Sequence, residues 1–307
     1  MFLLHPAAQL SWTTFTVHAS TAIGIAALGA AYAWRARRGP SASDRFPVRR
    51  PGDDRPHTVD EIDAAAARPG PTSGQRTSFY LSLAILFLSL NGPLHDLSDY
   101  YLFSAHMVQH LILTLVVPPL MIAGVPGWML RPLLRNRGMF SIARRFTTIG
   151  ACFVIFNVVL AFWHLPPMYN LAMQYHEVHI LQHLMFIGAS VLMWWPLTSP
   201  LPELPRAPYP AQMLYCFMMV IPMSVISIYI AMADTHLYPA YAIAPRVWGI
   251  SPMQDQQYGG LIMWIPGGVF FYAVMSVVFF KWSSRGEDDQ ASAQVDWRRP
   301  EGAISGP

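Results

Sequence analysis

The sequence predicts an all-α protein, a polytopic membrane helical bundle of seven transmembrane helices. Of its 307 residues, 53% are hydrophobic and only 12% are charged, and its mean hydropathy is +0.32. A soluble domain carries about 25% charged residues. Apolar runs of about 20 residues, the length that a helix needs to cross a bilayer, alternate with polar loops. These observations exclude an ordinary soluble domain.

The seven spans are expected where the apolar runs are longest. They cover residues 11–34, 78–94, 101–124, 146–163, 176–197, 211–233 and 258–281. Glycine and proline occur in several of them, and membrane helices tolerate both because neighbouring helices satisfy the freed backbone groups. The chain starts without a positively charged region or a small-residue cleavage site, so we expect the first run to be a mature span rather than a signal peptide.

The basic residues predict the orientation of these spans. Lysine and arginine concentrate in cytoplasmic loops. Here they follow the first, third, fifth and seventh spans, and of the 20 such residues Arg246 alone falls in a loop on the other side. The N-terminus is therefore predicted outside and the C-terminus inside the cell.

Composition divides the chain into four parts. Residues 1–34 form the first span, and residues 35–77, rich in proline, arginine, aspartate and alanine, are expected to be a disordered cytoplasmic linker. Residues 78–281 form a six-span bundle, and residues 282–307 a disordered cytoplasmic tail. Cys152 and Cys216 form no metal motif and are interpreted as small apolar packing residues.

Two stretches place histidines where hydrocarbon is expected, "SAHMVQHL" and "HEVHILQHLMFIG". His106 and His110 are four residues apart, and His176, His179 and His183 follow an i, i+3, i+7 spacing, so each set shares one helix face. From a rise of 1.5 Å per residue, His110 lies roughly 13 Å and His183 roughly 10 Å below the start of its span. Two helices that enter from the same side thus carry imidazoles at matched depth.

Imidazoles at this depth indicate a metal site. Polar groups there are costly in lipid and usually face the bundle interior with a partner. Imidazole suits copper, zinc, iron and nickel, and a nearby methionine favours Cu(I). No cysteine lies on the outer side, which argues against a cysteine-rich zinc site. The predicted ligands are His106, His110, His179 and His183, with His164 as a further candidate. The residues expected to orient them are Asp255, Gln256, His176 and His95, although Asp255 fits ordinary helix capping equally well.

Two other interpretations of the histidines remain open. A bis-histidine haem needs one imidazole on each side of the porphyrin, so four-residue spacing fits it less well than a compact mononuclear or dinuclear metal site. The histidines could also bridge helices without any metal. The sequence contains no P-loop, dinucleotide fingerprint or nucleophile elbow, and its basic residues do not suggest nucleic acid.

Three motifs resemble one known family. "HMVQHLILTLVVPPLMIAGVP", "FWHLPPMYNLAMQYHEVHILQHLMFIGASVLMWWPL" and "DQQYGGLIMWIPGG" are similar to the multi-span CtaG family, the assembly factors of caa3-type cytochrome c oxidase. This family is distinct from the single-span copper chaperone that shares its name. The resemblance covers most of residues 80–281. Its motif positions are His106, His110, His164, His179, His183, Asp255 and Gln256. The chain departs from the family pattern at Gln182, where an acid often precedes the last histidine.

The resemblance implies a protein of the bacterial inner membrane that helps haem-copper oxidase to mature. We therefore expect a non-enzymatic assembly factor that binds copper at its outer face and passes it to an oxidase subunit. The bilayer is its other environment, and no nucleic acid is expected. The alternative is a membrane metalloenzyme or a haem-binding redox protein that uses the same histidines. Such an enzyme would need a general acid or base, for which Asp96, Asp99, Glu177 and Asp234 are available.

Overall fold

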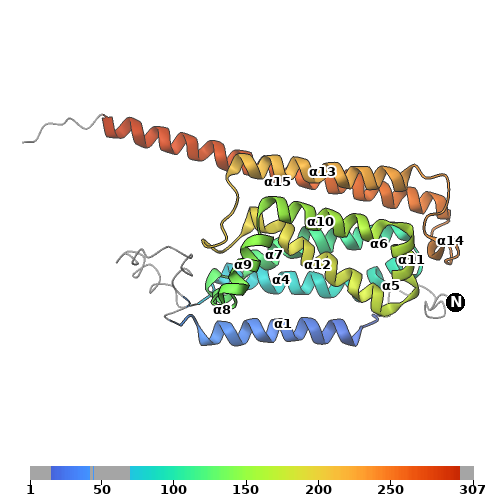
Figure 1. Ribbon diagram of the computed structural model, residues 1–307. Helices are drawn as coiled ribbons and strands as arrows, with labels where there is room; N and C mark the ends of the chain where they lie inside the picture. The colour runs from blue at the N-terminus through green and yellow to red at the C-terminus, as the bar shows by residue number, and fades with distance from the viewer. Residues whose placement is uncertain (1–14, 42–43, 45–69, 298–307) are drawn as a thin grey trace, which may run out of the picture.

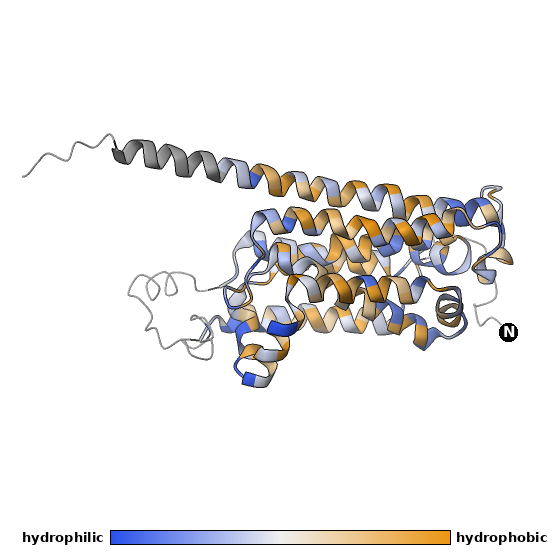
Figure 2. Cartoon of the chain, turned by 45° about the horizontal axis from the view of Figure 1, so that its top comes forward, coloured by the Kyte–Doolittle hydropathy of each residue, from blue (hydrophilic) through white to orange (hydrophobic). Residues whose placement is uncertain are grey.

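The computed structural model describes residues 15–41, 44 and 70–297, with side chains as far as residue 284. Every regular element in these ranges is helical, and the longer helices lie side by side with their axes roughly aligned (Figure 1). The prediction of an all-helical bundle is confirmed. Figure 2 shows apolar residues along the middle of the bundle and hydrophilic residues at its two ends, as a membrane protein requires.

The helices follow one another with short connections. They are α1 (Ala19–Arg38), α4 (Ser73–Ser89), α5 (Pro93–Tyr100), α6 (Phe103–Leu111), the π-helix η1 (Ile112–Val116), α7 (Val117–Gly124), α8 (Gly127–Leu134), α9 (Arg137–Phe146), α10 (Ile149–His164), α11 (Pro166–Gln174), α12 (His176–Thr198), α13 (Tyr209–Ala231), α14 (Pro239–Ala242) and α15 (Pro252–Trp297).

Four helices in the described ranges are long and apolar enough to cross a membrane. They are Phe103–Gly124 (α6, η1 and α7 together), His176–Thr198, Tyr209–Ala231 and Pro252–Ser284. Two bent pairs raise this to six if each pair is one span: α4 with α5, bent by 45°, and α9 with α10, bent by 72°. The alanine-rich helix α1 is not among these candidates. The structure therefore supports four to six spans, and the seventh span and the orientation remain predictions.

Some boundaries differ from those that hydropathy predicts. The first helix was expected over 11–34 but α1 covers Ala19–Arg38, because the alanine and arginine residues after the apolar run are good helix formers. Residues 11–14 and 45–69, which include most of the predicted linker, lie outside the described residues. Helix α15 continues beyond 281, through the start of the predicted tail, to Trp297.

The third apolar run is continuous only because a π-turn accommodates two prolines. Pro118 has no N–H to donate to the carbonyl of Thr114, and an α-helical proline ring would clash with that carbonyl. The residues Ile112–Val116 adopt the wider π conformation, and the Thr114 carbonyl accepts a hydrogen bond from the Trp194 indole at 2.9 Å. One turn below His110, this bond ties the span to α12.

Small residues let the last two long helices approach closely. A Cβ on Gly260 would lie 2.8 Å from the backbone nitrogen of Ala231, so any larger residue would push α15 away from α13. Beside it, a Cβ on Gly259 would lie 2.3 Å from the ring of Phe103. Helix α15 thus packs directly against both α13 and α6, which places its first turn at the same end of the bundle as the predicted histidine ligands.

The two ends of the bundle differ in composition. We call the end that carries α5, α11, α14 and the first turns of α6 and α12 the histidine end, and the end that carries α8 and α9 the arginine end (Figure 1). Between them lies the largest apolar cluster, with Phe103, Met107, Phe186 and Met219 nearly or fully buried. Cys152 and Cys216 are free and buried, in accordance with their interpretation as packing residues.

Candidate metal centre

Three histidines converge at the histidine end of the bundle. His106 of α6 and His179 and His183 of α12 are buried, and one ring nitrogen from each lies within 4.8 Å of the others. Metal–nitrogen bonds are about 2.0–2.1 Å long, so the nitrogens around one ion lie within about 4 Å of one another. Small side-chain rotations would bring these three to that spacing.

The hydrogen bonds of His106 leave its Nε2 free. The Tyr241 hydroxyl lies 2.7 Å from the carbonyl oxygen of Ser98, which can only accept, and 3.2 Å from Nδ1 of His106. Burial raises the pKa of Tyr241 well above its ordinary value, so the hydroxyl keeps its proton and donates it to Ser98. Nδ1 of His106 can then donate to the tyrosine oxygen, which also lies 3.0 Å from the Tyr169 hydroxyl. The lone pair of Nε2 is therefore available.

Asp99 has the same effect on His179. One carboxylate oxygen, Oδ2, lies 3.5 Å from Nδ1 of His179, while the other accepts a hydrogen bond from the Ser98 hydroxyl at 3.0 Å. A carboxylate cannot donate, so it favours the tautomer with the proton on Nδ1 and Nε2 free. A carboxylate behind a histidine in this way is common in metal sites, where it fixes the ring and strengthens the ligand.

The nitrogens left free are buried and unpaired. Within the described residues, Nε2 of His106, His179 and His183 has no hydrogen-bond partner. A buried polar atom without a partner costs about 1–3 kcal/mol, so three in one place are a considerable loss of stability. Three convergent lone pairs are the donor set that a borderline or soft metal ion takes. The residues present therefore fit a metal ion.

His110 and His164, also predicted as ligands, lie next to this group rather than in it. The ring of His110 is 4.2 Å from that of His106 and 5.6 Å from that of His183, and the ring of His164 is 6.2 Å from that of His110. His164 donates from Nδ1 to the Leu160 carbonyl at 2.7 Å. Neither ring nitrogen of His110, nor Nε2 of His164, has a partner among the described residues.

Asp255 and Gln256 bond to backbone groups, which differs from the role predicted for them. The Asp255 carboxylate accepts hydrogen bonds from the backbone N–H groups of Phe103 at 2.7 Å and Ser104 at 3.0 Å, so it caps the start of α6. Gln256 accepts from the backbone of Leu237 at 2.8 Å. Neither bonds to a histidine in the described part of the chain. Because α15 packs against α6, Asp255 holds the start of α6 in place, and Gln256 holds the loop that contains Leu237.

The other two residues expected to orient ligands lie on the outer side of the group. His95 is buried on α5, with Nδ1 3.1 Å from the amide nitrogen of Gln109 and Nε2 3.4 Å from Oδ2 of Asp99. His176 is exposed at the start of α12, and its ring lies 6.2 Å from that of His18. The sequence did not point to Tyr241 or Gln109, and it offered Asp99 only as a general acid or base for the enzyme alternative. All three contact the histidines.

A thioether and an amide complete the surroundings. Met173 of α11 is buried, with its sulfur 3.8 Å from the Tyr241 hydroxyl. Gln182 is buried, and neither its Oε1 nor its Nε2 has a partner among the described residues. It therefore adds further unpaired polar atoms to α12 beside the last histidine.

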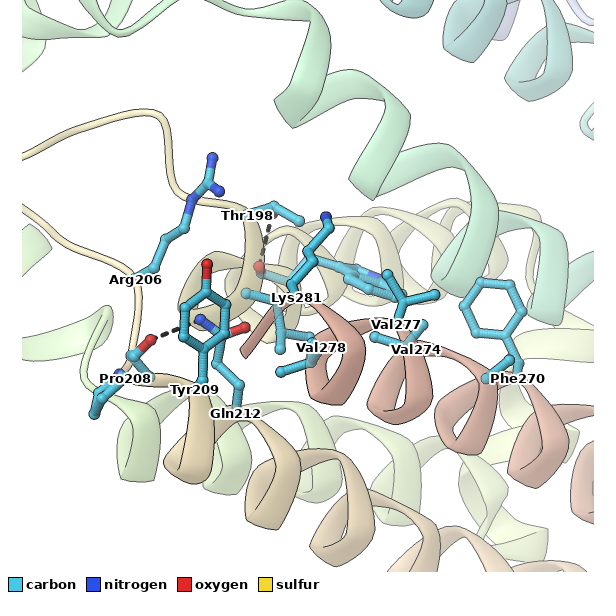
Figure 3. Close-up of a pocket in the computed structure, with 14 residues that line it drawn as sticks. Thr198, Arg206, Pro208, Tyr209, Gln212, Phe270, Val274, Val277, Val278 and Lys281 are labelled. Carbon is cyan, nitrogen blue, oxygen red and sulfur yellow. Dashed lines mark hydrogen bonds between the residues drawn. The ribbon is translucent and has the colours of Figure 1, made fainter. Parts of the chain in front are cut away.

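A separate cavity of about 560 Å³ lies at the arginine end, between α12, α13 and α15 (Figure 3). Its wall is mostly apolar, with Phe270, Val274 and Val278 on one side, and Arg206 and Lys281 stand at its edge. No histidine lines this cavity. It is not part of the candidate metal centre.

A helical bundle with four to six apolar spans and a buried histidine group defines a multi-pass membrane protein with a candidate metal centre. The chain belongs to the family described as cytochrome c oxidase caa3 assembly factor, CtaG, whose profile matches residues 62–285. This confirms the family that the motifs resemble, and it indicates a role in cytochrome c oxidase assembly. No curated protein and no solved structure shows a significant match.

Proposed function

We propose that this protein binds one copper ion at His106, His179 and His183 and delivers it to haem-copper oxidase during assembly in the bacterial inner membrane. The observation that carries this proposal is the convergence of three buried histidines, with one ring nitrogen of each within 4.8 Å of the others and with Nε2 of all three unpaired among the described residues. Membership of the caa3 oxidase assembly family supplies the process and the partner.

The chemistry of the site supports copper in the Cu(I) state over the other ions that imidazole binds. The three nitrogens are neutral donors when their Nδ1 atoms carry the protons, and the Met173 thioether lies near the tyrosine behind His106. Neutral imidazole and thioether ligands suit Cu(I), whereas a structural zinc site usually contains cysteine. Three protein ligands also leave a position open, through which an acceptor could take the ion.

His110 and His164 support this role from the inner side. The free nitrogens of His110 are close enough to exchange with the ligands by side-chain rotation, since the rings of His110 and His183 are 5.6 Å apart, and the ring of His164 lies 6.2 Å from that of His110. A carrier must release its cargo, and exchange among several similar ligands lowers the barrier to release. We therefore assign them as alternative ligands.

The test is metal content and spectrum of the purified full-length protein. Wild-type protein loaded with Cu(I) is expected to retain one ion per chain after desalting and to show no Soret band. The variant His106→Gln/His179→Gln/His183→Gln should lose the ion. His236→Gln, which changes an exposed histidine at the same end, should retain it. Copper retained by the triple variant would contradict the proposed site, and a Soret band in protein from cells would favour the haem alternative.

A further inference from the structure

The three candidate ligands are connected to the protein surface by more histidines. His176 is exposed, His18 is partly buried and His95 is buried. The ring of His18 lies 6.2 Å from that of His176 and 4.6 Å from that of His95, and the ring of His95 lies 6.4 Å from that of His179. We call His176, His18 and His95 the entry row. In this row each imidazole is next to the following one, from the exposed His176 to His179, a candidate ligand of the metal centre.

The segment before α1 is fixed in place so that His18 belongs to this row. The backbone N–H of His18 donates to Oδ1 of Asn91 at 2.8 Å, and the Thr16 hydroxyl donates to the Asp96 carboxylate at 2.8 Å. The backbone N–H of Gly92 donates to the Thr16 carbonyl at 2.9 Å. These three bonds hold His18 against the start of α5, although it is more than 70 residues away in sequence.

The nitrogens of the row can accept an ion. Nε2 of His18 is buried and has no hydrogen-bond partner among the described residues. Nδ1 of His95 accepts from the Gln109 amide, whose nitrogen also donates to the Ser89 carbonyl at 2.6 Å, so the proton of His95 is on Nε2. That nitrogen faces Oδ2 of Asp99 at 3.4 Å. An ion would therefore bind His95 at Nδ1, in place of the Gln109 amide, while Nε2 keeps its proton toward this carboxylate.

Charge also favours a cation at this place. Asp96 and Asp99 lie on α5 beside the row, and Asp99 touches both His95 and His179. The basic residue at this end in the described part of the chain is Arg246, and its guanidinium is bound to the carbonyl oxygens of Tyr241 and Ala244. Clefts lined by one sign of charge raise the local concentration of the opposite ion and its rate of binding.

We propose that His176, His18 and His95 form an outer loading site, from which a soft metal ion passes by way of Asp99 and His179 to the three-histidine centre. This inference rests on the proposed function, because it names the route to that centre. It assigns to His18 a role that the sequence does not suggest, and to His176 and His95 a role as transient ligands rather than as residues that orient others.

The test compares the rate of loading with the affinity at equilibrium. Cu(I) is presented to the full-length protein in detergent as a complex with a chromophoric chelator, and its transfer is followed by stopped-flow absorbance. His18→Phe keeps a ring packed on His95 but removes both nitrogens, and His95→Gln is a second variant. His236→Phe is the matched control, because this histidine is exposed at the same end but outside the row.

His18→Phe and His95→Gln are each expected to load at least about tenfold more slowly than wild type, the lower range of electrostatic and local-concentration effects on association. Their Kd for Cu(I), from chelator competition, should stay close to wild type because the three ligands are intact. His236→Phe should match wild type in both. Size-exclusion profiles establish that each variant is folded.

Two results overturn the proposal in different ways. If wild type binds Cu(I) and His18→Phe loads at the wild-type rate, the loading site is wrong while the proposed function stands. If wild type binds no Cu(I) at all, the proposed function fails and the loading site fails with it. A variant that loses affinity in proportion to its loading rate would show a ligand of the final centre instead, and would also contradict the proposed order of binding.

Discussion

The two ends of the bundle differ in how their buried polar groups are paired: those at the arginine end form ion pairs, whereas several at the histidine end have no partner among the described residues. At the arginine end, Arg131 of α8 is within 2.8 Å of the Glu203 carboxylate and donates to the backbone carbonyl of Asp44 at 2.9 Å. The Asp44 carboxylate is bound by the guanidinium groups of Arg35 and Arg135. Opposite charges are matched there, and the bonds connect α1 to α8.

At the histidine end, buried imidazole nitrogens lie close together without hydrogen-bond partners among the described residues. The imidazoles of His106, His110, His179 and His183 can offer lone pairs but have no partner for Nε2 in the described residues. Pairing stabilises a fold, whereas unpaired buried nitrogens reduce its stability. The arginine end therefore stabilises the fold, while the histidine end keeps an unfavourable arrangement that a bound ion would satisfy.

The largest effect is expected from breaking the pairing at the arginine end. Arg131→Met removes the guanidinium that pairs with the buried Glu203 carboxylate, which should reduce the free energy of unfolding by about 3–5 kcal/mol. Denaturant titration in detergent measures this loss. Arg131→Met/Glu203→Met removes both charges and should recover most of it. A double variant as unstable as the single one would show that the ion pair is not the cause.

The next effect is stabilisation of the histidine end by its ion. Cu(I) at 100 times its Kd should raise the free energy of unfolding by about 2.7 kcal/mol, because the ion binds the folded state alone. The same titration with and without Cu(I) measures it. The variant His106→Gln/His179→Gln/His183→Gln should not respond, and Arg131→Met should respond like wild type. If Cu(I) stabilised all three proteins equally, the histidines would not be the binding site and this difference between the two ends would be wrong.

A smaller effect is expected from the carboxylate behind the ligands. Asp99→Asn cannot hold the proton of His179 on Nδ1 as a carboxylate does, so Cu(I) affinity should fall by about 10–100-fold, as for other residues that orient metal ligands. Chelator competition measures the Kd. Asp96→Asn, on the same helix, is the control, since its carboxylate bonds to Thr16. An unchanged affinity in Asp99→Asn would exclude this role.

The smallest effect concerns pH at the arginine end. Burial opposes ionisation of Asp44, but hydrogen bonds from Ser41 and Arg35 outweigh it and hold the pKa of Asp44 below its ordinary value. Its contribution to stability is therefore present above the unfolded pKa and is lost as the pH falls through the folded one. The difference in Tm between wild type and Asp44→Asn should shrink over that interval. A difference that stays constant with pH would rule out this linkage.

Part of the site is predictable from local spacing alone. The i, i+4 pairs on α6 and α12 and their matched depth follow from helix geometry, and the structure brings His106, His179 and His183 together. Helix geometry does not give rotation about the helix axis, so the sequence does not separate these three from His110 and His164. It also does not give Asp99 or Tyr241, because the contacts of these residues depend on how α5 and α14 pack on the ends of other helices.

Asp255 is a second residue whose role the local sequence pattern does not determine. Its position at the mouth of the last helix suggests either a cap or a residue that orients histidines, and local pattern does not decide between them. The close approach of α15 to α6, which Gly259 allows, brings its carboxylate to the backbone of Phe103 and Ser104. It caps a helix other than its own, which no rule based on neighbours in sequence describes.

Four properties follow from the sequence alone: the helical class, the apolar runs, the separation of histidine from arginine between the two ends, and the family. These properties depend on composition and on periodicity within single helices, which the solvent and the backbone geometry dictate. Three other properties are visible only in the folded chain: which imidazoles share one centre, which oxygens accept hydrogen bonds from them, and which histidines lie between the centre and the surface. Those properties depend on the rotation and contact of helices far apart in the chain, such as the close approaches of α15 to α6 and α13 at Gly259 and Gly260.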